Sequence, residues 1–152
     1  MNEVQMTELD LSSLGERSVP TGKIKYVPSV LACYGLGIYF PGVQSCLPVV
    51  IWTPNAPFAL AMHVASPINT PDELKAEIAD FKRQCPFPDD PFHISAVKII
   101  SPNERRIAQI KGREKNIAFL KSLTKLEEIP TDSELGENLS FHVSSGFCVV
   151  RT

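Results

Sequence analysis

The chain has 152 residues, a formal net charge of −2 at pH 7 and a pI near 5.9, and 43% of its residues are hydrophobic. A chain of this length buries a core without disulfide bonds, and its composition is that of an ordinary globular protein. The sequence lacks the basic stripe that phosphate binding requires, and no apolar run is long enough to span a membrane. We therefore predict one globular domain with neither a nucleic-acid surface nor membrane insertion.

The start of the chain and its cysteines bear on the cellular compartment. Residues 1–4 show no basic segment followed by an apolar stretch, so we predict a cytoplasmic protein without a signal peptide, with export without a leader left open. The four cysteines, at positions 33, 46, 85 and 148, are scattered and form no C-x-x-C pair. This pattern favours free thiols over a disulfide framework or a zinc site. We expect no metal or organic cofactor.

The first part of the chain reads as an arm followed by strands. Residues 1–22 are polar and contain turn formers, which predicts a flexible N-terminal arm ahead of a domain over residues 23–152. Apolar residues between 23 and 37 predict one or two strands. The glycines at 35–37 and the Pro-Gly pair at 41–42 predict a bend or loop.

Two short apolar segments, 44–54 and 58–67, come next in the chain. Both are continuous apolar runs that contain β-branched residues, which is typical of buried strands. Two prolines and an asparagine in 54–57 predict a turn between them. We therefore expect two neighbouring strands.

A helix, a strand and a second helix follow. Residues 70–84 begin with an N-cap Thr, a Pro and the Glu of a capping box, and they place apolar residues on one helical face. Residues 93–101 predict a strand, and the second helix is expected to begin past Gly112. Its apolar stripe comprises Ile117, Leu120, Leu123 and Leu126.

The C-terminal part predicts a connection and a hairpin. Residues 127–138 are mostly polar and read as a connection. The segments 139–143 and 147–150 alternate apolar and polar residues around a short turn that contains Gly146, which predicts a β-hairpin. The order of the elements predicts an α/β fold with antiparallel strand pairs rather than a regular βαβ ladder.

Cys46 and His63 stand on the two neighbouring apolar segments. A thiol and an imidazole near the same end of two paired strands have the arrangement that a thiolate nucleophile and its base require. Each residue also has a structural explanation, because Cys is often buried as a small apolar residue and a buried His needs only a polar partner. A register change of one residue would turn His63 to the opposite face of its sheet.

In these motifs the chain resembles the chemoreceptor glutamine deamidase (CheD) family of bacterial cysteine-dependent deamidases. The resemblance spans residues 28–151. The matching residues are Ser45, Cys46, residues 52–54, His63, Pro67, residues 98–100, Gly112, Arg113, Asn116, Gly136 and residues 145–151.

The resemblance implies a layered α/β sandwich of mixed, largely antiparallel strands flanked by two main helices. It implies hydrolysis of a glutamine side-chain amide on a protein substrate, with Cys46 as nucleophile and His63 as general base. Backbone N–H groups near Ser45 and Cys46 would stabilise the oxyanion, with Ser45 as a supporting donor and Gln44 beside the substrate slot. It further implies a protein substrate that carries the target glutamine, and a regulatory protein as a second partner.

The chain departs from the family pattern at two positions beside the expected site. Gln44 stands where the family has Gly, and Phe40 stands where the family has a third catalytic residue, a Thr. Tyr39 and Phe40 either form an aromatic lip over the site or pack in the core. Two alternatives to the chemoreceptor deamidase therefore stay open. One is an inactive binding module of the same fold, and the other is an exported effector that deamidates a host protein.

Overall fold

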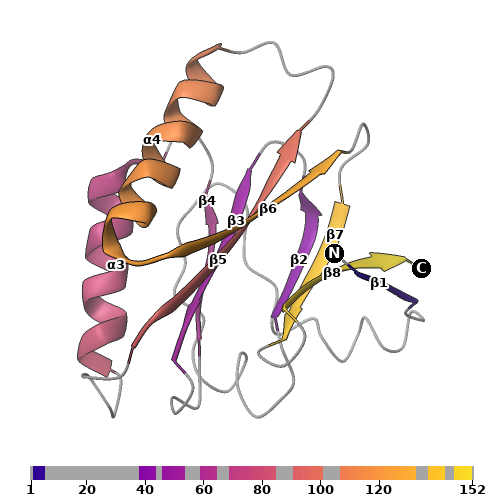
Figure 1. Cartoon of the computed structure of the whole chain (residues 1–152), viewed down its shortest axis with the longest axis horizontal. Helices are drawn as coiled ribbons and strands as arrows, with labels where there is room; N and C mark the ends of the chain where they lie inside the picture. The colour runs from indigo at the N-terminus through magenta and orange to yellow at the C-terminus, as the bar shows by residue number, and fades with distance from the viewer. Residues whose placement is uncertain are drawn as a thin grey trace.

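The computed structural model describes residues 2–5, 38–43, 46–53, 59–64, 69–84, 91–100, 107–132, 137–142 and 146–151. These residues form three layers (Figure 1): two helices lie on one face of a four-stranded sheet, and a second four-stranded sheet lies on its other face. We call the middle layer the central sheet and the outer layer the hairpin sheet. The predicted α/β fold is confirmed at this level.

The central sheet has the strand order β4-β3-β5-β6. Its strands are β3 (Leu47–Trp52), β4 (Leu60–Val64), β5 (His93–Ile100) and β6 (Leu126–Asp132). Strand β3 pairs antiparallel with both β4 and β5, whereas β5 and β6 are parallel. The prediction that the two apolar segments form neighbouring strands is confirmed, and so is the strand predicted over residues 93–101. The turn predicted at 54–57 lies outside the described residues.

Strand β6 corrects the sequence analysis, which predicted a polar connection over residues 127–138 and placed Leu126 at the end of a helical stripe. The strand carries two glutamates, a proline and an aspartate, so neither alternation nor β propensity marks it. It lies at an edge of the sheet, with β5 as its neighbour. A proline, which lacks a backbone N–H, is tolerated in an edge strand because the outer side of that strand pairs with no further strand of the sheet. With β5 and the intervening helix, β6 forms a βαβ unit, which the sequence analysis did not expect.

The hairpin sheet has the strand order β1-β8-β7-β2. Its strands are β1 (Asn2–Gln5), β2 (Ile38–Val43), β7 (Glu137–His142) and β8 (Gly146–Arg151). Strands β7 and β8 are antiparallel, which confirms the predicted hairpin. Gly146 begins β8 with φ of +74°, a left-handed conformation that favours glycine and suits the end of a tight turn.

Two strands of the hairpin sheet were not expected. Residues 2–5, within the predicted arm 1–22, form β1 and pair parallel with β8; residues 6–22 lie outside the described residues, as do the strands predicted in 23–37. The Pro-Gly pair 41–42, predicted as a bend, lies inside β2. The pairing of β2 with β7 shifts register between Phe40 and Val43, and an irregularity of this kind accommodates a proline in a strand.

The two helices are α3 (Pro71–Gln84) and α4 (Ile107–Leu123). Helix α3 has the predicted bounds, with acidic residues in its first turn and basic residues in its last, as the helix dipole favours. Helix α4 begins before Gly112, which lies inside it, so the predicted start was wrong. Asn116 Nδ2 donates to the main-chain oxygen of Asn69 over 3.1 Å and ties α4 to the start of α3. No helix of the described part has the length and apolar character to cross a membrane.

The two faces of the central sheet bury two separate apolar clusters. The helix-side core comprises Leu47, Val49, Ile51, Leu60, Met62, Val64, Leu74, Ile78, Phe81, Ile94, Ala96, Ile117 and Leu120. The inter-sheet core comprises Ile38, Phe40, Val43, Val50, Ala59, Ala61, Val97, Leu139, Phe141, Phe147 and Val149. Alternate residues of β3 and β4 enter different clusters, as the two-residue period of a strand requires.

Candidate functional site

The register of β3 and β4 sets the relation between Cys46 and His63. Pro48 is paired directly with His63, and Leu47 with Val64. Cys46 immediately precedes β3 and lies two residues before Pro48, so it is a diagonal neighbour of His63. Diagonal neighbours on one face of an antiparallel pair are about 7–8 Å apart, within reach of long or aromatic side chains.

Strand alternation places Cys46 and His63 on the same face of the central sheet. Cys46, just before β3, packs against the inter-sheet core, to which Val50 of β3 belongs. On β4, Met62 and Val64 belong to the helix-side core, so His63 between them faces the hairpin sheet together with Ala61. The register of β3 and β4 therefore keeps the thiol and the imidazole on one face of the sheet, without the one-residue shift that would separate them.

Burial differs between the two residues. Cys46 is half-buried, whereas His63 is 0% exposed. A molecule that approaches this part of the sheet from solvent would thus meet the thiol before the imidazole. The imidazole is enclosed, and any polar group at that depth depends on protein partners rather than on water.

Phe40 contacts His63 from the hairpin sheet. The two rings are 6.0 Å apart between centroids and meet edge to face at 81°, a favourable geometry for aromatic pairs. The Phe40 ring in turn lies 6.0 Å from the ring of Phe147. The residue that replaces the third catalytic residue of the resembled family is therefore brought against the imidazole, but as an apolar ring without a hydrogen-bonding group. Phe147 was not singled out in the sequence, where it reads only as one apolar position of the hairpin.

The surroundings of the Cys46 thiol favour its protonated form. Burial raises the pKa of Cys46 above its ordinary value of 9.0, because desolvation disfavours the thiolate. The buried Nε2 atom of His63 has no hydrogen-bond partner in the described part of the chain, although the residue makes other interactions. Desolvation thus works against formation of a thiolate at Cys46, which lies on the same face of the central sheet as the imidazole.

The remaining predicted site residues are placed less fully. Gln44 and Ser45 lie outside the described residues. Tyr39 alternates with Ile38 and Phe40, which both enter the inter-sheet core, so its side chain belongs to the opposite face of the hairpin sheet. Burial raises the pKa of the Tyr39 phenol as well. Only Phe40 of the two predicted lip residues therefore reaches the site.

Other candidate ligands and nucleophiles do not converge on this place. Within the described residues, no three side chains of His, Cys, Asp or Glu are grouped as a metal site would need. Cys148 is buried as a free thiol on β8. It alternates with Phe147 and Val149 of the inter-sheet core, so it faces away from the central sheet.

A second group of polar and aromatic residues lies at the opposite end of β3 and was not found from the sequence. Trp52 is paired with His93 across β3 and β5, and their rings stack with centroids 4.5 Å apart and planes 21° apart. Beyond His93, the Ser95 hydroxyl donates to Glu127 of β6 over 3.4 Å. These side chains line a hollow of about 480 Å³. Its recognition needs the pairing of β5 with β6, and the sequence did not reveal β6.

The chain was compared with models of known protein families and with curated protein sequences. Neither comparison gives a match. The resemblance to the chemoreceptor deamidases therefore rests on the sequence motifs around Cys46, His63 and the C-terminal hairpin alone.

Proposed function

We propose that the protein is a cysteine-dependent amide hydrolase that deamidates a glutamine side chain of a protein, with Cys46 as nucleophile and His63 as general base. One observation carries the proposal: β3 and β4 pair in the register that puts both side chains on one face of the central sheet. The layered α/β arrangement and the resemblance of the Cys and His motifs support it. The same proposal includes a target protein, which is either a chemoreceptor or a host protein, and a regulatory protein as a second partner.

The reaction needs only groups that these residues supply. His63 takes the thiol proton as Sγ attacks the amide carbon of glutamine, which forms a C–S bond and a tetrahedral oxyanion. The oxyanion collapses, the C–N bond breaks, and the imidazolium protonates the leaving group to give ammonia and a thioester. Water then attacks the thioester with His63 as base, the C–S bond breaks, and glutamate and the thiol are released.

A neutral resting thiol fits a mechanism in which proton transfer accompanies attack. Because burial raises the pKa of Cys46, little thiolate is present at neutral pH, and the rate depends on the base. General-base assistance contributes about 10²- to 10⁴-fold in typical enzymes. His63 should therefore strongly accelerate the reaction of Cys46 with a substrate-like electrophile at neutral pH. It should not accelerate the reaction at a pH where the thiol is already ionised.

The test is labelling of Cys46 by an N-acetylated glutamine analogue whose side-chain amide is replaced by a chloromethyl ketone. We expect His63→Gln to slow this labelling at neutral pH by about 10²-fold or more. Iodoacetamide at a pH above the thiol pKa should label Cys46 at the same rate in both proteins. Peptide mass mapping locates the label, and circular dichroism checks that the variant is folded; His63→Asn replaces it if it is not.

Cys148 and Cys46→Ser provide the controls. Cys148 is a buried thiol that faces away from the central sheet, so its labelling should not depend on His63. Cys46→Ser should abolish labelling at the site. If Cys46 is labelled no faster than Cys148, or at a rate that is the same without His63, the proposal is wrong.

A second candidate is a catalytically inactive binding module of the same fold. The edge-to-face contact between Phe40 and His63 favours it, because a ring occupies the place of a hydrogen-bonding group. The raised pKa of the Cys46 thiol points the same way. Labelling that is independent of His63, in a folded protein, is the result this candidate requires.

A further inference from the structure

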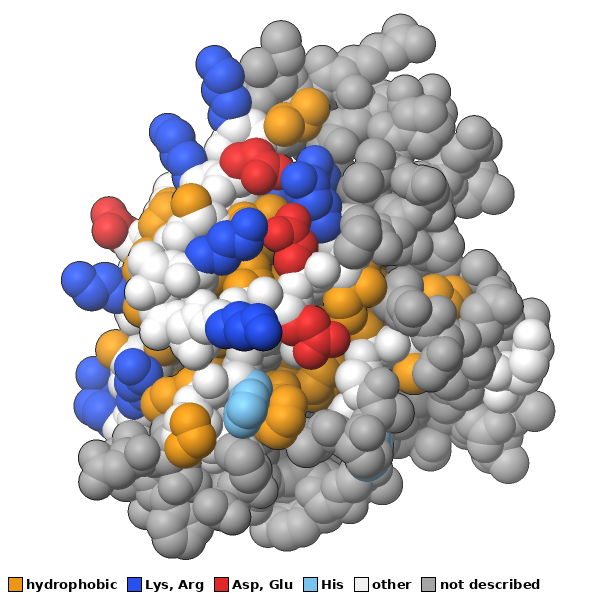
Figure 2. Space-filling view, in the orientation of Figure 1, with side chains coloured by type: hydrophobic (Ala, Val, Ile, Leu, Met, Phe, Trp, Pro, Cys, Tyr) orange, Lys and Arg blue, Asp and Glu red, His pale blue; other side chains and the backbone are white. Residues whose placement is uncertain are grey.

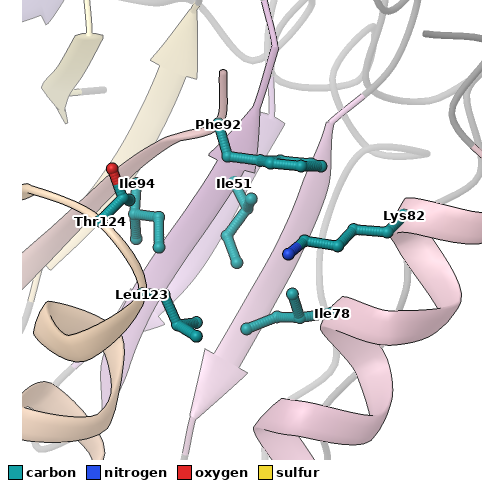
Figure 3. Close-up of a pocket in the computed structure, with 7 residues that line it drawn as sticks. All are labelled: Ile51, Ile78, Lys82, Phe92, Ile94, Leu123 and Thr124. Carbon is teal, nitrogen blue, oxygen red and sulfur yellow. The ribbon is translucent and has the colours of Figure 1, made fainter. Parts of the chain in front are cut away.

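A slot opens between the ends of the two helices on the helix side of the central sheet (Figure 3). Two strands, two helices and two connections contribute to it. Its walls are Ile51 of β3, Ile94 of β5, Phe92 just before β5, Ile78 and Lys82 of α3, Leu123 at the end of α4, and Thr124. The side chains point toward one another from the sheet below and from the two helices on either side, as Figure 3 shows.

The slot is apolar and small. Its volume is about 30 Å³, whereas sites for metabolites and cofactors measure about 300–1,000 Å³. Leu123 lines it with 44% of its surface exposed, and no other large hydrophobic residue of the described part is exposed. A space of this size and lining accepts a methyl end of one aliphatic side chain.

The mouth of the slot is cationic. Lys82 extends from α3 over the Phe92 ring, with its Nζ atom 4.9 Å from the ring centroid. Lys125, which follows Thr124, is exposed and lines the neighbouring hollow together with Glu127. In the described part of the chain Lys82 forms no salt bridge, so its ammonium group is the charge that the slot offers to an anion.

The slot adjoins the hollow beside Trp52. Phe92, Ile94 and Thr124 line both, and the hollow has a volume of about 480 Å³. Figure 2 shows Lys and Arg side chains spread over the face that carries the helices, with Asp and Glu side chains and hydrophobic atoms between them. Residues that flank an anchored side chain would therefore lie near Lys82 and near the hollow beside Trp52.

We propose that this slot is a docking site for an acidic segment of a partner protein, which inserts one leucine or isoleucine and places a neighbouring carboxylate on Lys82. The occupant follows from charge complementarity at the mouth and from the size of the apolar space. The site lies on the face of the central sheet opposite to Cys46 and His63, so it goes beyond the proposed reaction and does not depend on it.

The experiment is a titration followed by methyl NMR of the four aliphatic wall residues Ile51, Ile78, Ile94 and Leu123. The probe is the acetylated, amidated peptide Gly-Glu-Leu-Glu-Gly. Two matched peptides replace its leucine by alanine or its glutamates by lysine. We expect saturable shifts of the slot methyls with the first peptide only, because the second lacks the anchor and the third has the wrong charge.

Variants assign the binding to the slot. Lys82→Glu should weaken the acidic peptide about tenfold or more, and Leu123→Ser should weaken it while leaving the fold intact, since Leu123 is already exposed. The control is Lys111→Glu, an exposed lysine of α4 about 18 Å along the helix from Leu123, which should change the affinity little.

Three results would overturn the docking proposal. The first is an absence of saturable shifts with the acidic peptide, and the second is equal binding of the acidic and basic peptides. The third is a shift of the slot methyls with protein concentration alone, because the occupant would then be a second copy of this chain. Labelling of Cys46 by the glutamine analogue should be the same in Lys82→Glu and the native protein, so failure here is distinct from failure of the hydrolase proposal.

Discussion

The two faces of β3 and β4 hold different kinds of residues. Toward the helices, β3 and β4 present only Leu, Val, Ile and Met side chains, all fully buried or nearly so. Toward the hairpin sheet, Cys46, Pro48 and Val50 alternate along β3, and Ala61 and His63 along β4. From the hairpin sheet, the Phe40 ring packs against His63. The candidate catalytic groups therefore lie on the face that adjoins another sheet, whereas β3 and β4 contribute only apolar packing to the helix face.

The largest effect is expected from removing the Phe40 ring. Phe40→Ala should cost about 3–5 kcal/mol of unfolding free energy, as for other buried Phe residues, since Phe40 is 0% exposed. It should also speed His63-dependent labelling of Cys46, because the ring no longer packs on the imidazole. Urea unfolding and the labelling assay measure the two effects.

Phe81→Ala is the matched control on the helix side. Phe81 is also 0% exposed and should cost about the same 3–5 kcal/mol, but the labelling of Cys46 should stay as in the native protein. Equal changes of labelling in both variants would mean that looseness of the core, and not the contact with His63, governs the thiol. Phe40→Thr then tests whether a hydroxyl at this position raises labelling further.

A middle-sized effect is expected from Asn116, a fully buried polar residue on the helix side. Asn116→Ala removes the buried hydrogen bond to the Asn69 carbonyl and should cost about 1–3 kcal/mol. Labelling of Cys46 should not change, because the bond joins the two helices and not the sheets. Ser122→Ala, which removes an exposed bond within α4, should cost less than about 0.5 kcal/mol. A change in Cys46 labelling on loss of Asn116 would show that the two faces are coupled.

The contrast between the faces also explains what the sequence could predict. Strands β3 and β4 are buried on both faces, so their continuous apolar runs are clear, and their short connection makes antiparallel pairing the expected arrangement. The register, which decides whether Cys46 and His63 share a face, depends on a turn whose length the sequence does not define. Strand β6 could not be predicted, because its charges suit an edge and its partner β5 is distant along the chain.

Phe40 and the docking slot show a second limit. The sequence places Phe40 six positions before Cys46, but its contact with His63 joins two sheets and arises only from their packing. The slot is built from two strands and two helices together with their connections. The periodicity of the sequence identifies the apolar positions, but it does not predict which of them line a cavity. The slot depends on how the ends of α3 and α4 are placed over the sheet.

A smaller effect concerns pH and the half-buried thiol. Burial raises the pKa of Cys46 above its unfolded value, so the folded protein holds this proton more tightly. The stability it contributes is present below 9.0, the ordinary pKa of the thiol, and is lost as pH rises through the folded value. We expect unfolding free energy to fall with pH above 9.0 in the native protein and less steeply in Cys46→Ser. The pKa of Tyr39 is also raised, so the slope common to both proteins includes its contribution.

The smallest effect is expected from a charged cluster between β5, β6 and α4 on the helix side of the central sheet. Lys98 of β5 contacts Glu114 of α4 over 2.6 Å and Glu128 of β6 over 4.0 Å, and Lys121 contacts the same Glu128 over 3.2 Å. These charges are partly exposed, and pairs of this kind contribute about 0.2–1 kcal/mol. Lys98→Met should therefore lower the unfolding free energy by less than about 1 kcal/mol at low salt, and high salt should remove the difference.

This small effect bears on why β6 carries charge at all. An edge strand with free N–H and C=O groups pairs with other chains unless charged side chains or prolines prevent it, and β6 has both. If its charges serve this purpose, Lys98→Met combined with Glu128→Val should leave stability nearly unchanged but increase concentration-dependent association, measured by light scattering. A large loss of stability without association would instead assign the charges to the packing of α4 on the sheet. The double variant thus distinguishes two roles of these charges, prevention of association at the β6 edge and packing of α4 on the sheet. The sequence of β6 alone is compatible with both roles.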